Sequence, residues 1–205
     1  MLLFVVNINY KNIAVPKYLQ LWSNIYMSND VRFEKIRSPD KSKLLLLHEI
    51  IDEIEPADTF ERLSDADKKY LFNPKYRINF GAYKDRSLIS ALGLEFDKQK
   101  LSHYSKVLAA KGLASADTNI CSLEHLMTHP DHRSSPYADG LRLVTILSEI
   151  AVNQARKREY EFIVATTHPE NKPSRRVFEK LDFEIATEDM KSRSGYPRLL
   201  LTKEL

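Results

Sequence analysis

The chain has 205 residues, of which 43% are hydrophobic, enough to bury one sizeable core in a single domain or a domain with an extension. Its 31 basic and 28 acidic residues leave a formal charge of +3, which argues against wholesale nucleic-acid binding but allows a local basic groove. One cysteine, Cys121, excludes an internal disulfide, and no apolar run reaches the roughly 18 residues of a membrane span. The apolar start Met1–Ile8 lacks a basic segment and a cleavage site, so we expect a cytoplasmic protein with no membrane partner.

The first thirty residues are predicted to form an extension packed on the main domain, 31–205. Within the extension, an apolar run predicts a strand over Leu2–Ile8. Apolar residues at helical spacing after a proline predict a helix over Pro16–Met27. Val31–Arg37 alternates apolar and charged residues, which is typical of a half-buried strand. The main domain therefore begins near Val31.

Two helical segments follow the first strand of the main domain. They are predicted over Lys43–Ile54 and roughly Thr59–Phe72, with an interruption near Pro56. Ser64 with Asp67 three residues on has the pattern of a capping box. Helical hairpins of this kind often form one wall of a cleft.

The middle of the chain alternates strands with one helix. Arg77–Tyr83 and Leu88–Phe96 are strand-like runs on either side of the polar tetrapeptide Lys84–Ser87, which predicts an antiparallel hairpin. Leu101–Ala110 is predicted to be a helix, because Gly112 lies just past its end.

The last hundred residues predict a parallel crossover. The strand Ile120–Met127, the apolar-periodic helix Leu141–Ala155 and the buried strand Phe162–Ala165 have the order that such a crossover requires. A final helix and two strands complete an α+β fold around one mixed sheet: Pro173–Leu181, Phe183–Thr187 and Arg198–Thr202.

The junction between the strand Ile120–Met127 and the following helix is the most informative segment. A helix N-terminus collects unpaired backbone N–H groups and the positive end of the helix dipole. Phosphate and pyrophosphate groups are readily held at such a junction. The sequence therefore predicts a phosphorylated ligand next to the loop that starts within Glu124–Arg133.

Two segments carry a family resemblance. Glu124-His125-Leu126-Met127-Thr128-His129-Pro130-Asp131-His132-Arg133 resembles the fourth strand of the GCN5-related N-acetyltransferase (GNAT) superfamily and the Arg that opens its pyrophosphate loop. Asn171-Lys172-Pro173-Ser174-Arg175-Arg176-Val177-Phe178-Glu179-Lys180-Leu181-Asp182-Phe183 resembles the family's Asn-x-x-Ala/Ser-x-x-x-Tyr/Phe-Glu-Lys-x-Gly-Phe segment. The resemblance spans about Val31–Leu205. It implies a GNAT fold, with a mixed, mostly antiparallel central sheet and flanking helices.

The resemblance also implies acetyl-CoA, or another acyl-CoA, as co-substrate. Its pantetheine arm would enter between the fourth and fifth strands of the family fold, which diverge. In the phosphate loop, Pro136 stands where the family has its middle glycine, which removes one backbone donor that the hydroxyls of Ser134 and Ser135 could replace. The cofactor-binding residues implied are Met127, Thr128, Arg133, Ser134, Ser135, Tyr137, Ala138, Asp139, Gly140, Asn171 and Ser174.

Amine acylation needs a base for the nucleophile, and the resemblance assigns this role to Glu124, directly or through water. The alternative for Glu124 is a solvent-facing carboxylate or an ion-pair partner. A regular strand would point His125 to the opposite face, so only one of the two is expected to face the cleft. Many members of the family use a Tyr as the general acid, but this chain has Phe178 at the matching position. Tyr137, Tyr196 or bound water are the remaining candidates for the general acid.

Several other residues have both a functional and a structural interpretation. Asn171 could contact pantetheine or cap a helix, and the same alternatives apply to Ser174. The basic residues after Asn171 could lie near CoA phosphates or form a solvated face: Lys172, Arg175 and Arg176. Cys121 is expected to pack as a small apolar residue. No metal site is expected, because His129, Asp131 and His132 have no spaced second cluster.

Three functions remain open from the sequence. The first is an N-acyltransferase that passes acetyl from CoA to a small-molecule amine or a peptide amine by direct attack in a ternary complex. The second uses a longer acyl group or an acyl-carrier protein as donor, and the third is a GNAT-like binding or regulatory module without catalysis. A homodimer formed through the extension 1–30 is possible.

Overall fold

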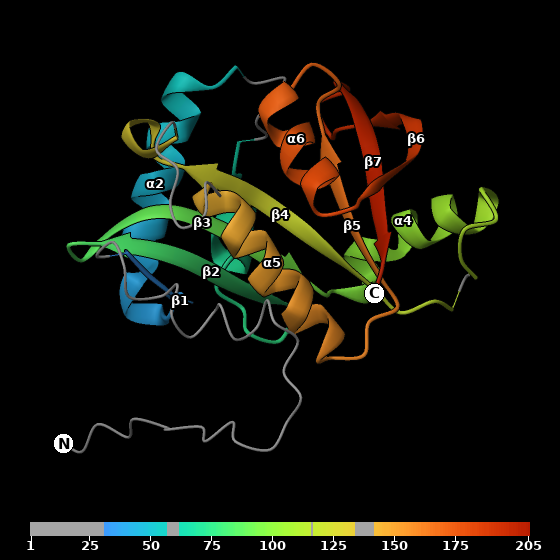
Figure 1. The fold of residues 1–205 in the computed structure, drawn as a ribbon, viewed down its shortest axis with the longest axis horizontal. Helices are drawn as coiled ribbons and strands as arrows, with labels where there is room; N and C mark the ends of the chain where they lie inside the picture. Colours follow the sequence, from blue (N-terminus) through green and yellow to red (C-terminus); the bar gives the residue numbers. More distant parts are fainter. Residues whose placement is uncertain (1–30, 57–61, 116, 134–141) are drawn as a thin grey trace.

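The computed structural model describes residues 31–56, 62–115, 117–133 and 142–205 (Figure 1). The predicted strand and helix of the extension lie outside the described residues, as does the loop segment 134–141 with six of the predicted cofactor-binding residues. The division of the chain at residue 30 therefore stays a prediction.

One sheet of seven strands forms the centre of the described part, in the order β1-β2-β3-β4-β5-β7-β6 (Figure 1). Neighbouring strands are antiparallel except β4 and β5, which are parallel and so confirm the predicted crossover. The predicted α+β class with a mixed, mostly antiparallel sheet is confirmed. The strands are β1 (Val31–Lys35), β2 (Arg77–Lys84), β3 (Ser87–Glu95), β4 (Ile120–Thr128), β5 (Phe162–Thr167), β6 (Glu184–Lys191) and β7 (Pro197–Glu204).

Helices cover both faces of the sheet, with α5 and α6 on the face nearer the viewer in Figure 1 and α2 and α4 on the other. The larger apolar core lies under α5 and α6, and two smaller cores lie under α2 and α4. Of the helices that the structure describes, none has the length and apolar character needed to cross a membrane. The helices are α2 (Lys41–Ile54), α3 (Asp65–Tyr70), α4 (Lys98–Ala110), α5 (Leu143–Arg156) and α6 (Lys172–Lys180).

The hairpin between β2 and β3 turns over two residues, not over the predicted tetrapeptide. Asp85 and Arg86 have φ of 48° and 70°, as in a type I′ turn, whose twist matches that of the flanking strands. Lys84 and Ser87 therefore remain paired with each other in the ladder. All four residues of the tetrapeptide are polar, so the sequence did not indicate that the strands continue to Lys84 and Ser87.

Helix α3 is shorter than the segment predicted around it, because it begins only at Asp65 and ends at Tyr70. The predicted capping box is confirmed: the N–H of Asp67 donates to Ser64 Oγ at 3.2 Å, and the N–H of Ser64 donates to Asp67 Oδ2 at 3.2 Å. Helix α4 starts three residues earlier than predicted, at Lys98, because the Asp97 side chain caps it.

Strand β4 contains a bulge that reverses which residues face which side. Glu124 lies opposite Gly93 and Met127 lies opposite Ala91, so His125 and Leu126 together face one residue of β3. His125 has a positive φ, 53°, as the first residue of a G1-type bulge does. The alternation of β4 shifts accordingly: Leu123 packs under α5 before the bulge, whereas Met127 packs under α2 after it.

Candidate active site

Strands β4 and β5 separate halfway along their length. They pair only over Ile120–Leu123 and Phe162–Ala165. The rest of β5 continues to pair with β7, whereas Glu124–Thr128 of β4 pairs with no other strand on this side within the described residues. Figure 1 shows the two arrows diverging toward their carboxyl ends. The divergence expected from the family resemblance is confirmed, and it leaves a gap at the centre of the sheet.

The end of β4 presents backbone groups to this gap. The N–H of His129 donates to the carbonyl of Ile89 at 2.8 Å, on the β3 side. Because peptide groups alternate along a strand, those of Thr128 point the other way, toward the gap. There the carbonyl of Thr128 accepts from Arg133 Nε at 3.0 Å. The carbonyl of Met127 instead accepts from the Ser90 hydroxyl at 2.6 Å.

A cavity of about 920 Å³ extends from this gap between α2, α3 and α4 on one side and α6 and the β6–β7 hairpin on the other. Six of the predicted site residues line it: Glu124, Met127, Thr128, Arg133, Asn171 and Ser174. The other six lie outside the described residues: Ser134, Ser135, Tyr137, Ala138, Asp139 and Gly140. Their predicted contact with a cofactor stays a prediction.

Glu124 lies where β4 leaves β5. Burial raises the pKa of its carboxyl, while the Arg77 guanidinium and a hydrogen bond from Ser122 oppose that rise. The Ser122 hydroxyl donates to Glu124 Oε1 at 2.7 Å. A carboxylate with a raised pKa is a better proton acceptor than an ordinary one, so the environment suits a general base.

The expectation that His125 would point away from Glu124 is wrong. The bulge brings His125 to the same cavity, where its ring lies 5.1 Å from that of His48 on α2. Burial and the nearby Arg77 lower the pKa of both histidines, that of His48 to about 3. Both rings are therefore neutral at pH 7, and neither competes with Glu124 for the proton of an ammonium group.

Arg77 connects the floor of the cavity to Glu124 and was missed in the sequence. Its side chain is only 6% exposed, and its Nε donates to Asn79 Oδ1 at 2.8 Å. It crosses β3 above Gly93, where a Cβ would lie only 2.1 Å from one guanidinium nitrogen. Gly93 thus makes room for the cation beside Glu124, its partner in the strand register. No local pattern predicts this arrangement, because it depends on the register of three strands.

Tyr70 and Lys100 form the wall of the cavity opposite α6. The Tyr70 hydroxyl donates to Glu95 Oε1 and Asp97 Oδ2, at 2.9 and 2.8 Å. Burial and these two acceptors raise the pKa of Tyr70. The ammonium of Lys100 lies over the Tyr70 ring, 3.3 Å from its centroid. The wall is therefore built from a fixed phenol and a cation.

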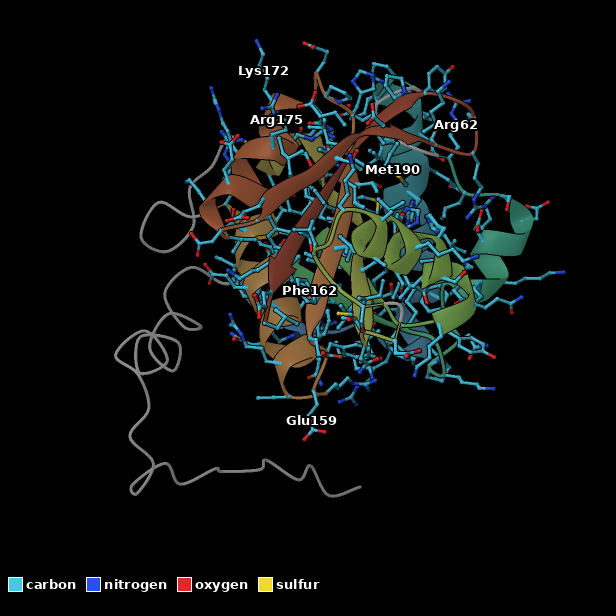
Figure 2. All side chains as sticks on the ribbon, turned by 90° about the vertical axis from the view of Figure 1, so that its right-hand side faces the viewer. Arg62, Glu159, Phe162, Lys172, Arg175 and Met190 are labelled. Carbon is cyan, nitrogen blue, oxygen red and sulfur yellow. The ribbon has the colours of Figure 1, made fainter. Side chains whose placement is uncertain are left out.

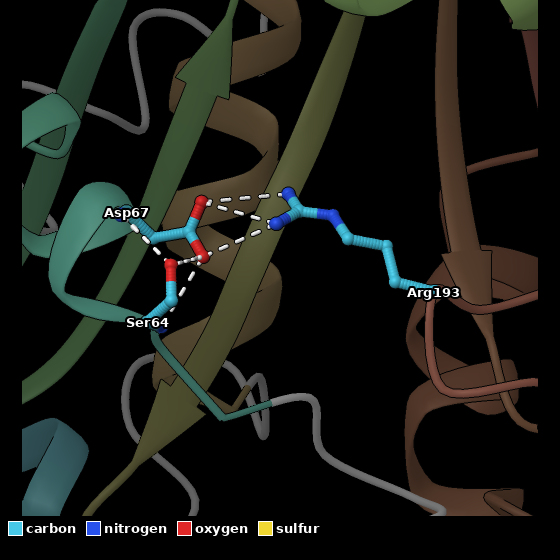
Figure 3. A network of polar contacts seen from close by, with 3 residues as sticks. All are labelled: Ser64, Asp67 and Arg193. Carbon is cyan, nitrogen blue, oxygen red and sulfur yellow. Dashed lines mark hydrogen bonds and ion pairs between the residues drawn. The ribbon is translucent and has the colours of Figure 1, made fainter.

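An ion pair joins the two sides of the cavity. Arg193, between β6 and β7, contacts Asp67 of α3 with Nη1 at 3.2 Å from Oδ2 and Nη2 at 3.4 Å from Oδ1 (Figure 3). Asp67 is held in place by its capping box with Ser64. Burial opposes ionisation of Asp67, but Ser64 and Arg193 prevail and lower its pKa. The pair links residues 126 positions apart, which no sequence pattern indicated.

The contacts at the start of α6 show a structural role for Asn171 and Ser174, the capping of the helix. The Asn171 side chain accepts from the backbone N–H of Ser174 at 3.1 Å and so caps the helix. Both residues also line the cavity, which leaves their predicted cofactor contact open. Lys172 and Arg175 lie at the outer end of α6 (Figure 2), and Arg175 Nη1 donates to the carbonyl of Pro169 at 3.2 Å.

Of the two tyrosines predicted as candidates for the general acid, only Tyr196 lies in the described part of the chain, and it does not line the cavity with Glu124. Tyr196 is 39% exposed and does not line the cavity, and Tyr137 lies outside the described residues. Phe178 is buried in the main core against Phe183. Tyr70 and Tyr104 are the tyrosines that line the cavity in the described part of the chain.

Two minor predictions can also be placed. Cys121 is buried among apolar residues, and burial raises the pKa of its thiol, so it packs as predicted. His129 accepts from the backbone N–H of Asp131 through Nδ1 at 3.4 Å, which is a local turn contact. The described residues contain no group of three metal-binding side chains.

The chain matches one family model and many solved structures. Residues 104–192 match the family described as FR47-like protein. An N-acetyltransferase from Staphylococcus aureus Mu50 is 14% identical over 85% of this chain and 97% of that chain, with a TM-score of 0.58. Arabidopsis thaliana NAA60 in complex with acetyl-CoA is 14% identical over 85% and 98%, with a TM-score of 0.64. No protein of curated function matches the sequence.

A third similar structure is that of FeeM, an N-acyl amino acid synthase from uncultured soil microbes. It is 11% identical over 87% of this chain and 92% of that chain, with a TM-score of 0.65. At these identities the likeness shows a shared fold, which is the one that the sequence resemblance implied.

Proposed function

We propose that this chain, which has the fold of the GNAT superfamily and matches the FR47-like family model, transfers an acyl group from acyl-CoA to an amine. The amine nitrogen attacks the thioester carbonyl directly in a ternary complex. A C–N bond forms, the C–S bond breaks, and CoA leaves as a thiolate that takes up a proton. Glu124 receives the proton that the amine loses.

The divergence of β4 from β5 is the observation that carries this proposal. It places the outward-facing peptide groups of Thr128 beside a cavity of about 920 Å³. An extended pantetheine arm has amide groups that can pair with such a strand edge. The thioester at its end would then lie near Glu124, which is four residues back along β4.

The basicity of Glu124 supports its assigned role. Its carboxyl is partly buried, with a raised pKa, and Arg77 keeps the carboxylate accessible as the deprotonated form. A positioned base of this kind contributes roughly 10²–10⁴-fold to a rate. The leaving thiolate needs no protein acid in this scheme, because water can supply its proton.

A longer acyl donor is the second candidate. NAA60 was solved with acetyl-CoA, whereas FeeM is described as an N-acyl amino acid synthase, and both share this fold. Pro136 in the loop predicted to bind the CoA phosphates also favours a changed donor. Comparing acetyl-CoA, longer acyl-CoA and acyl-carrier protein as donors separates the two candidates.

A thiol-release assay with a panel of amines tests the proposal. We expect amine-dependent release of CoA by the wild type, reduced about 10²–10⁴-fold by Glu124→Gln. The matched control is Glu34→Gln, which removes an exposed carboxylate on β1 and is expected to retain activity. Release that is absent with every donor and amine, while the protein is folded, would indicate a non-catalytic GNAT-like module.

A further inference from the structure

One end of the cavity, formed by α3, α4 and the β6–β7 hairpin, is rich in cations. Across the whole cavity, eight Lys and Arg face five Asp and Glu in the described part of the chain. Arg133 pairs with Glu55 at the other end, and Arg77 offsets Glu124 on the floor. The cations at the end formed by α3, α4 and the β6–β7 hairpin are Arg62, Lys100, Lys191 and Arg193.

Two of these cations come from opposite walls of the same cavity. Lys100 of α4 is fixed over the Tyr70 ring, and Arg193 reaches across from the β6–β7 hairpin to α3. Both are close enough to His125 to lower its pKa, although less than burial and Arg77 do. Lys100 and Arg193 line the same cavity as Glu124, the proposed base, so their positive charge faces the space in which the acceptor would bind.

The contact between Arg193 and Asp67 shows that this guanidinium can bind a carboxylate. Its two terminal nitrogens hold the carboxylate of Asp67 side by side, as a planar fork does (Figure 3). The Arg193 side chain is 69% exposed, and exposed ion pairs contribute little to stability. A carboxylate that entered the cavity could therefore take the place of Asp67.

We infer that Lys100 and Arg193 bind the carboxylate of a small amino-carboxylic acid, such as a free α-amino acid, whose amine faces Glu124. The inference rests on the proposed function and specifies its acceptor. Such a molecule carries one positive and one negative group, and the cavity offers the complement of each. An amine without an acidic group would make no such contact with Lys100 and Arg193.

Matched acceptor pairs test this inference. Free amino acids and their carboxamides share the amine and the side chain but differ in the carboxylate. With acetyl-CoA or the best longer acyl-CoA as donor, kcat/KM is expected to be about 10-fold or more higher for the acids, since a charge-assisted hydrogen bond is worth about 1.5–3 kcal/mol. The difference is expected mainly in KM.

Variants identify the residues responsible. Lys100→Gln and Arg193→Gln should each reduce the preference for the acid, and the double variant should remove it. Lys106→Gln is the matched control, because Lys106 is exposed on the same helix and does not line the cavity. Three results would each overturn the inference. The carboxamides are acylated as well as the acids, the preference for acids persists in the double variant, or phosphoethanolamine is a better acceptor than the amino acids.

Binding separates failure of the inference from failure of the proposed function. The protein is saturated with CoA and titrated calorimetrically with the same acids and amides. Acids that bind better than amides support the inference even where turnover is slow. Equal or absent binding of acids and amides overturns it, while binding of acetyl-CoA in a separate titration leaves the proposed function intact.

Discussion

At the scale of single residues, the site depends on how three groups set the charge of Glu124. Burial disfavours its carboxylate, and Arg77 and Ser122 favour it. A base raised in this way is protonated at low pH and becomes active as the pH rises through its pKa. The acidic limb of the pH–rate profile should therefore lie above the ordinary carboxyl value of about 4.5.

Ser122→Ala should move that limb to higher pH. The variant removes a hydrogen bond of 2.7 Å that stabilises the charged form of Glu124, so the carboxyl pKa rises further. The measurement is kcat/KM against pH for the wild type and the variant. Ser90→Ala is the control, because this buried hydroxyl donates to Met127 instead. A limb that stays in place or moves to lower pH would contradict this description of Glu124.

Gly93→Ala should affect both stability and the same pH limb. The new Cβ would lie within 2.5 Å of three atoms of the buried Arg77 guanidinium, which must move away from Asn79 and Glu124. We expect a loss of about 1–3 kcal/mol in the free energy of unfolding, measured with urea, and a shift of the limb to higher pH.

Gly112→Ala provides a comparison for Gly93→Ala. Nothing lies within 4 Å of a Cβ at Gly112, so only its φ of +70° opposes the change. This variant should lose about 1 kcal/mol of stability and keep the wild-type pH profile. Equal pH profiles for the two variants would show that Arg77 does not act on Glu124.

At the scale of elements, the bulge in β4 is the decisive feature. It allows consecutive residues, Glu124 and His125, to face one cavity, although a regular strand would separate them. In this placement His125 has a positive φ of 53°, which strains the backbone of a residue other than glycine. The strand therefore combines a ladder on one side with an irregular, functional end on the other.

Replacing His125 should distinguish the backbone from the side chain. Asn tolerates a positive φ, whereas a β-branched Val does not. We expect His125→Val to be about 1–2 kcal/mol less stable than His125→Asn in urea unfolding, although both lose the ring contact with His48. Equal stability of the two variants would mean that the bulge relaxes and does not impose its φ.

Many elements could be predicted from local sequence patterns. The capping box at Ser64, the helix α5 and the parallel crossover all follow from local patterns. The bulge could not be predicted, because its segment contains no glycine and its register is set by β3. For the same reason Arg77 was missed, since it meets Gly93 only after the strands have paired.

At the scale of the whole molecule, the cavity combines parts from nearly the full described chain. Helices α2, α3 and α4 form one side, and α6 with the β6–β7 hairpin forms the other. The predicted site residues on β4 and α6 line this cavity, and their roles stay predictions. The contact between Asp67 and Arg193 was not predicted, because it joins distant segments without a sequence motif.

Calorimetric titration with acetyl-CoA, CoA and a longer acyl-CoA tests the central claim most directly. We expect saturable 1:1 binding by the wild type that weakens several-fold in Arg133→Ala, since Arg133 holds the end of β4 to Glu55 beside the predicted phosphate loop. The control is Arg32→Ala, which removes an exposed ion pair on β1. This variant should bind like the wild type. Binding of no CoA species by the folded protein would contradict the claim that this chain is an acyl-CoA-dependent N-acyltransferase.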